Sequence, residues 1–68
     1  MSGEKLGVRL KEARAAAGLT QAELAERVGV SRKTINTVEN GVFIPSTLLA
    51  LKLAVVLKTR VEDLFYVD

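Results

Sequence analysis

The chain contains no cysteine and no histidine, so two common devices for stabilising a small fold are excluded. Without cysteine there is no disulfide, and without either residue type there are no ligands for a structural zinc site. A chain of 68 residues buries only about 60% of the surface that it exposes when unfolded. We therefore expect very regular helix packing or oligomerisation to stabilise the fold, and no metal or other cofactor.

Proline and long apolar runs are also scarce. A single proline and 49% hydrophobic residues exclude a disordered chain. No apolar run approaches the roughly 18 residues needed to cross a bilayer, and the first residues lack the apolar core of a signal peptide. We expect a cytoplasmic protein without membrane contact. It is not expected to be an enzyme, because its serines and threonines lack an adjacent base.

Apolar periodicity and capping residues predict one all-α domain over residues 1–68. Leu6, Leu10, Ala13 and Ala17 are three or four residues apart, which predicts one face of a first helix. Thr20-Gln21-Ala22-Glu23 is the pattern of a capping box, so a second helix is predicted to begin at residue 21 and to end at residue 29, a glycine.

Three further helices are predicted after residue 30. Ser31 caps a helix that ends at Asn40-Gly41, and Ser46 caps a helix over about residues 47–57. A short fifth helix is predicted to hold Val61, Leu64 and Phe65, and residues 66–68 are expected to be extended.

The segment from Gln21 to Asn40 carries the functional prediction. Ala25 lies where the two helices would approach most closely, and Gly29 permits the turn between them. The predicted buried side of this unit consists of Leu24, Val28, Val30, Ile35 and Val38. A glycine between two helices by itself commonly marks a simple helix hairpin. The combination at this spacing favours the helix-turn-helix, whose second helix lies in the major groove of double-stranded DNA.

These residues resemble the xenobiotic-response-element family of helix-turn-helix regulators, the lambda-repressor and Cro type. The resemblance runs from about Val8 to Phe65 and rests on L-T-Q-A-E-L-A, G-V-S-R-K-T-I-N, V-E-N-G, Pro45-Ser46, L-A-L-K-L-A and V-E-D-L-F. It is strongest for the compact subgroup of stand-alone regulators. The resemblance implies a five-helix lambda-repressor-like domain whose dimers bind palindromic operators.

The helical period assigns the face that reads bases. Ile35 and Val38 define the inward face of the third helix, so the side chains that point outward are those of Lys33, Asn36, Thr37 and Asn40. Arg32 and Lys33 suit guanine, Asn36 suits adenine, and the Thr37 methyl suits thymine. The resemblance implies base contacts at Arg32, Lys33 and Thr37.

Phosphate contacts are predicted at Gln21, Ser31, Thr34 and Asn40. Gln21 opens a helix, where the amide and the helix N-terminus favour a phosphate oxygen, and the resemblance implies such contacts at Gln21 and Asn40. The alternative for Ser31 is a purely capping role, and for Asn40 a role as helix terminator. The resemblance also implies a structural ion pair between Arg14 and Glu39.

Apolar residues stand at several positions where relatives often carry polar ones. The loop that contains Ile44 is apolar, and Leu48 and Val55 lie on one stripe of a helix that is apolar almost all round. The predicted dimer interface consists of Leu48, Val55, Ile44, Tyr66 and Val67. The alternative is a surface with scattered exposed apolar residues, which is common.

The sequence therefore predicts a homodimeric transcriptional regulator, most simply a repressor, located with the DNA of the nucleoid. The formal net charge of +2 is compatible with a polyanionic partner. No small-molecule ligand is indicated. The alternative is a protein-interaction module such as the antitoxin of a toxin–antitoxin pair, against which we count the lack of an extra segment to wrap a toxin.

Overall fold

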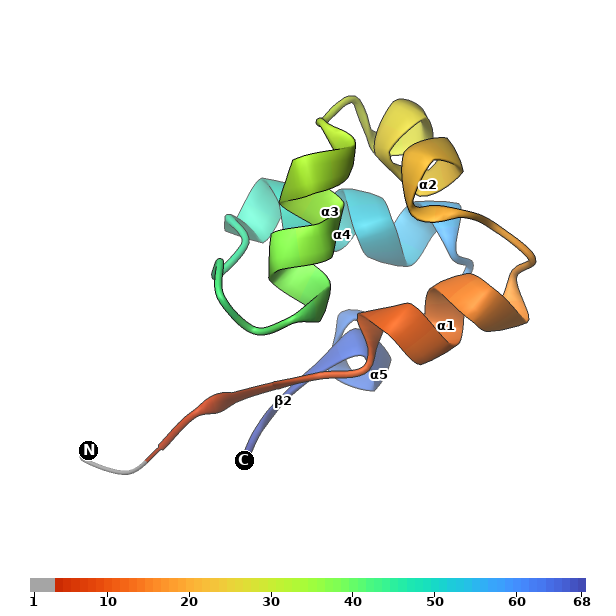
Figure 1. Ribbon diagram of the computed structural model, residues 1–68. Helices are drawn as coiled ribbons and strands as arrows, with labels where there is room; N and C mark the ends of the chain where they lie inside the picture. Colours follow the sequence, from red (N-terminus) through yellow and green to blue (C-terminus); the bar gives the residue numbers. More distant parts are fainter. Residues whose placement is uncertain (1–3) are drawn as a thin grey trace.

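Five short helices and a two-stranded sheet make up residues 4–68, the part of the chain that the computed structural model describes (Figure 1). In chain order the elements are β1 (Leu6–Val8), α1 (Leu10–Ala16), α2 (Gln21–Val28), α3 (Arg32–Glu39), α4 (Thr47–Val56), α5 (Val61–Leu64) and β2 (Phe65–Val67). The predicted five-helix fold with a helix-turn-helix at α2 and α3 is confirmed, and the small sheet is an addition to it.

The capping residues begin the helices where the sequence predicts. The Thr20 Oγ1 accepts from the Glu23 N–H at 3.0 Å, and the Thr20 N–H donates to the Glu23 carboxylate at 2.8 Å. That backbone hydrogen bond from Thr20 lowers the pKa of Glu23 below its ordinary value, because it stabilises the ionised carboxylate. Ser31 and Ser46 accept from the backbone N–H three residues later, each at 3.1 Å. Three of the five helices thus begin with a satisfied cap.

Gly29 ends α2 and turns the chain into α3. Its φ of +77° lies in the left-handed region, where a Cβ would be strained. The N–H groups of Gly29 and Val30 both donate to the Ala25 carbonyl, at 2.9 and 3.0 Å. A Cβ at Gly29 would meet no atom within 4 Å, so the backbone conformation alone accounts for glycine here.

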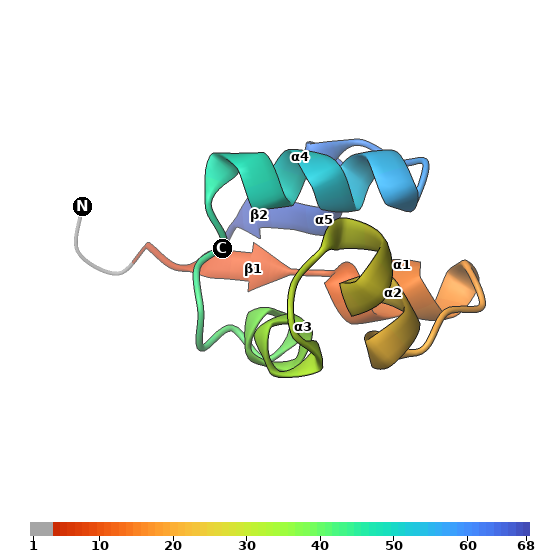
Figure 2. The same cartoon turned by 90° about the horizontal axis from the view of Figure 1, so that it is seen from above.

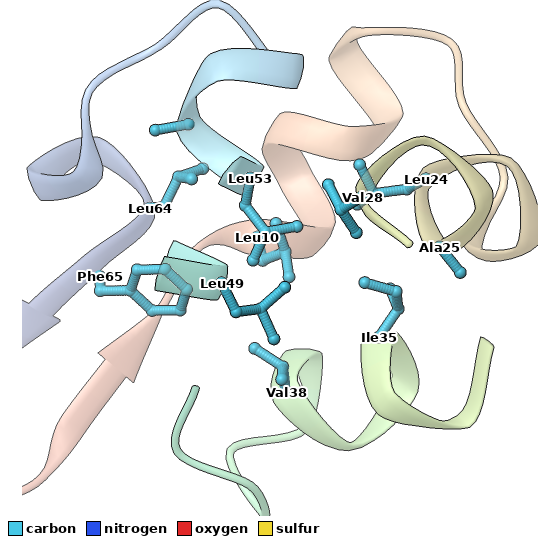
Figure 3. Packing of buried hydrophobic residues seen from close by; sticks show 11 residues of the cluster. Leu10, Leu24, Ala25, Val28, Ile35, Val38, Leu49, Leu53, Leu64 and Phe65 are labelled. Carbon is cyan, nitrogen blue, oxygen red and sulfur yellow. The ribbon is translucent and has the colours of Figure 1, made fainter. Parts of the chain in front are cut away.

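The core lies between the helix-turn-helix and α4 (Figure 3). Its largest side chains that are fully buried come from α1 to α5: Leu10, Leu24, Ile35, Val38, Leu53 and Leu64. Ala25 is 3% exposed, in agreement with its predicted place in the contact between α2 and α3. Val30 packs against this core while partly exposed.

The N-terminal segment corrects one prediction. Leu6 was expected on the first helix, but it lies in β1, which pairs antiparallel with β2 in the register Leu6 to Val67 and Val8 to Phe65. The helix begins only at Leu10, and the Arg9 N–H donates to the Leu64 carbonyl at 2.8 Å. The spacing of Leu6 and Leu10 fits a helix, but pairing with a strand about sixty residues away satisfies the backbone of β1 instead.

The C-terminal segment differs from expectation by one residue. Phe65 was expected in the fifth helix, but α5 ends at Leu64 and Phe65 begins β2, where its buried ring packs against the core. The extended conformation of Tyr66 and Val67 is confirmed. Between α4 and α5, Lys58 has a φ of 54°, a left-handed conformation that residues with a Cβ rarely adopt.

Two classes of feature are absent from residues 4–68. None of the helices there is long and apolar enough to cross a membrane. The same residues contain no group of three or more acidic side chains placed to hold a metal ion.

Candidate nucleic-acid interface

Helix α3 presents a polar face to solvent because its opposite face is fully buried. Ile35 and Val38 are 0% exposed and fix the rotation of the helix against the core. Arg32, Lys33 and Asn36 are consequently exposed, and together they line one hollow on the surface. Within residues 4–68 neither Arg32 nor Lys33 is engaged in an ion pair. Two free cations and an amide therefore share one face of α3.

The hydroxyl of Thr37 is occupied by its own helix. It is shared between the carbonyls of Lys33 and Thr34, with both distances at 3.0 Å. A hydroxyl held in this way is not free to donate to a base. The methyl group is then the part of Thr37 that remains for an apolar contact, which is the contact predicted for it with thymine.

Asn36 and Asn40 are joined by a side-chain hydrogen bond. The Asn40 Nδ2 donates to the Asn36 Oδ1 at 3.2 Å, one turn along the helix. A bidentate contact with adenine requires both the oxygen and the nitrogen of the Asn36 amide. The Asn36 Oδ1, which would accept from the adenine amino group, already accepts from Asn40, whereas the Asn36 Nδ2 donor makes no side-chain bond within residues 4–68. A contact with adenine would therefore compete with the bond from Asn40 for the Asn36 oxygen.

Ser31 and Thr34 form the N-terminal cap of α3. The Ser31 Oγ accepts from the Thr34 N–H at 3.1 Å, and the two hydroxyl oxygens are 2.9 Å apart. The capping role of Ser31 is confirmed. Contacts of Ser31 and Thr34 with phosphate stay predictions. Their mutual bond uses one of the two hydroxyl hydrogens, so the other hydrogen is available to a phosphate oxygen.

A partly buried ion pair ties α1 to the end of α3. The Arg14 Nε and Nη2 donate to the two carboxylate oxygens of Glu39, at 2.5 and 3.2 Å. The side chains are 14% and 2% exposed, respectively. The hydrogen bond to Glu39 raises the pKa of Arg14, so the guanidinium stays charged. A third Arg14 bond, from Nη1 to the Leu19 carbonyl at 2.9 Å, fixes the chain just before α2.

Gln21 joins this ion pair, which the sequence did not predict. Its Nε2 donates to the Glu39 carboxylate at 3.0 Å, across 18 residues. The side chain thus bridges the first residue of α2 and the last residue of α3. No local spacing signals such a bond, because it depends on how the two helices cross.

Apolar side chains gather on other parts of the surface. The most exposed of the large ones are Val42, Ile44, Leu48, Val55 and Val67, at 63–77%. Tyr66 is less exposed, at 36%, because its ring covers Gly7 and lies under the guanidinium of Arg9 at 4.2 Å. The structure thus leaves four of the five predicted interface residues strongly exposed.

Two of the predicted interface residues lie at different ends of α4. Figure 2 shows α4 along one side of the molecule and α3 on the other. Leu48 lies at the end of α4 that follows the Ile44 loop, whereas Val55 lies seven residues further, about 10 Å along the helix. Val55 lines a hollow of about 310 Å³ between α2 and α4, and Leu48 lines a second hollow; Val28 and Lys52 belong to both.

Comparison with known proteins supports this description. A family model described as helix-turn-helix matches residues 10–64. An HTH-type transcriptional regulator of Archaeoglobus fulgidus is 52% identical over 60 residues, covering 88% of this chain and 86% of that protein. The regulator YgzD of Bacillus subtilis is 42% identical over 60 residues, covering 88% of this chain and 91% of that protein.

A solved structure shares the arrangement of the helices. The restriction-modification controller protein C.AhdI from Aeromonas hydrophila superposes with a TM-score of 0.76 at 38% identity. The match covers 81% of this chain and 83% of that one. Both fold and sequence therefore agree with relatives of nearly the same length.

Proposed function

Because the chain belongs to the helix-turn-helix family of transcriptional regulators, of the xenobiotic-response-element type, it is a DNA-binding regulator, and we propose that it represses transcription as a homodimer on a palindromic operator. In this proposal α3 enters the major groove. Arg32 and Lys33 contact guanine, Asn36 contacts adenine, and Thr37 contacts a thymine methyl. Gln21, Ser31, Thr34 and Asn40 contact phosphates.

The face of α3 is the observation that carries the proposal. Arg32, Lys33 and Asn36 are exposed side by side on a helix whose other face is fully buried. A helix held in this way offers donors in a fixed orientation, which is what reading base edges in the major groove requires. The N-termini of α2 and α3 add backbone N–H groups that favour phosphate oxygens.

The exposed apolar residues support the homodimer. Two recognition helices must face the same side of one duplex, with half-sites about 34 Å apart. An interface through the middle of α4 would place them back to back, because α4 lies on the side opposite α3 (Figure 2). The end of α4 that carries Leu48, with Ile44 in the loop before it, suits the two-fold axis better, and these side chains are exposed by 63% and 72%. Tyr66 and Val67 on β2 would extend the contact.

Selection of duplexes from a random pool tests the DNA-binding part of the proposal. We expect a palindromic consensus, and binding of that duplex should weaken steeply as salt is raised. Arg32→Ala and Lys33→Ala should each weaken specific binding by about 1–3 kcal/mol, the cost of one bidentate base contact. Arg60→Ala is the matched control, because it removes an equal charge from the residue before α5, where Arg60 is exposed and paired with Glu62. Retained affinity in both α3 variants would refute the base contacts.

Sedimentation of charge variants tests the dimer. Leu48→Glu and Ile44→Glu should give monomers, because each places a charge in an apolar contact. Ala15→Glu on the exposed side of α1 is the matched control and should remain dimeric. Val55→Glu tests whether the interface lies at the other end of α4. If Val55→Glu alone gives monomers, the interface lies over the hollow between α2 and α4.

The protein-interaction module remains the second candidate. The hollow lined by Val28, Leu51 and Val55, with Arg27 and Lys52 among its lining residues, could hold another protein. A wild-type protein that sediments as a monomer and selects no duplex would favour this candidate over the repressor.

A further inference from the structure

We propose that Glu39 is a positioning residue for DNA binding, because its buried carboxylate fixes the Gln21 amide with one N–H directed outward to a backbone phosphate. The inference rests on the proposed function, since it requires a duplex for Gln21 to contact. It assigns to Glu39 a role in binding that differs from holding α1 and α3 together.

Glu39 is a fixed point in the structure. Its side chain is 2% exposed, and its carboxylate accepts from the Arg14 Nε and Nη2. Arg14 is held in turn by the Leu19 carbonyl. Arg14 therefore holds the Glu39 carboxylate in place independently of Gln21.

The chemistry of the pair decides which end of the Gln21 amide faces inward. An ionised carboxylate has only acceptor sites, so it attracts the Nε2 of Gln21 and repels the Oε1. The Nε2 donates one hydrogen to Glu39 at 3.0 Å. Within residues 4–68 this is the one hydrogen bond of the Gln21 side chain, so the second Nε2 hydrogen is available to a ligand.

The place of Gln21 in the fold determines what that hydrogen can meet. Gln21 is the first residue of α2, an eight-residue helix, and is only partly exposed. The same helix end offers backbone N–H groups without intrahelical partners, which favour an anion. A side chain that is ordered before binding loses less conformational entropy when it meets the phosphate. Glu39 therefore contributes to affinity without contacting DNA.

A double-mutant cycle separates positioning from a purely structural role. Duplex affinity is measured for the wild type, Gln21→Ala, Glu39→Gln and the double variant, all at one salt concentration and at a temperature where circular dichroism shows each to be folded. We expect Gln21→Ala to weaken wild-type binding by about tenfold, the effect of losing one hydrogen bond to a charged group. In the Glu39→Gln background the same change should cost less than about threefold, because the neutral amide no longer dictates which end of Gln21 faces inward.

Lys33→Ala provides the matched control for the cycle. Lys33 lies on α3 and makes no hydrogen bond with Glu39, so its removal should weaken binding equally in both backgrounds. If Gln21→Ala also costs the same in both backgrounds, the inference is overturned while the proposed function stands. If the wild type binds no selected duplex, the proposed function itself fails.

A measurement on the wild type covers the case in which Glu39→Gln does not fold. In the free protein, the Gln21 side-chain amide should have an NMR order parameter near the roughly 0.85 of rigid backbone. A value below about 0.6 would show a mobile amide and would overturn the inference.

Discussion

Removing Arg14 should cost more stability than removing Arg14 and Glu39 together. Arg14→Met leaves the Glu39 carboxylate, 2% exposed, without its cation. Breaking a buried pair in this way typically costs about 3–5 kcal/mol, because an unpaired charge stays in a region of low dielectric constant. Gln21 still donates to Glu39, so we expect a loss of about 3 kcal/mol, at the lower end of this range.

This loss is large for a chain of 68 residues, whose expected stability is about 3–10 kcal/mol. In Arg14→Met/Glu39→Met no charge remains buried, and such replacements are often neutral. The double variant loses the hydrogen bonds to the Leu19 carbonyl and from Gln21, at about 1 kcal/mol each. We therefore expect the double variant to be more stable than the single one by about 1 kcal/mol or more.

Urea unfolding followed by circular dichroism measures both differences. All variants are compared at one protein concentration, because the stability of a dimer depends on concentration. Arg60→Met is the matched control, since Arg60 and Glu62 are 73% and 70% exposed and such pairs contribute at most about 1 kcal/mol. A single variant as stable as the double one would refute the reasoning, as would an equal loss in the control.

Three further changes test local features of the fold. Gly29→Ala should destabilise by about 1–2 kcal/mol in urea unfolding, because φ is +77° and the added Cβ meets no neighbour; no loss would contradict a purely conformational role. Lys58→Gly should raise the free energy of unfolding by up to about 1 kcal/mol, because a left-handed φ of 54° suits glycine, and a loss would contradict this. The pKa of Glu23 is below its ordinary value of 4.5, so its stabilising effect is complete above that pH and is lost as the pH falls toward the lowered value. The melting temperature of the wild type should accordingly fall more steeply below about pH 5 than that of Glu23→Gln, and parallel curves would refute this assignment.

Local chemistry determined most of the helix boundaries. The caps at Thr20, Ser31 and Ser46 and the turn at Gly29 depend on residues within four positions of each other, so the sequence displays them directly. The buried side of the helix-turn-helix follows from the helical period for the same reason. The face of α3 that carries Arg32, Lys33 and Asn36 could therefore be predicted without coordinates.

Contacts between distant segments decided the rest. The apolar spacing of Leu6 fits a helix as well as a strand, and only the antiparallel register with Val67 selects the strand. The bond from Gln21 to Glu39 likewise depends on the crossing of α2 and α3. The stripe of Leu48 and Val55 was visible in the sequence, but the hollows that these residues line with Val28 of α2 appeared only when α2 was placed beside α4. The sequence by itself thus specifies what short-range hydrogen bonds and periodicity encode, whereas pairings across long separations depend on the packing of the whole chain.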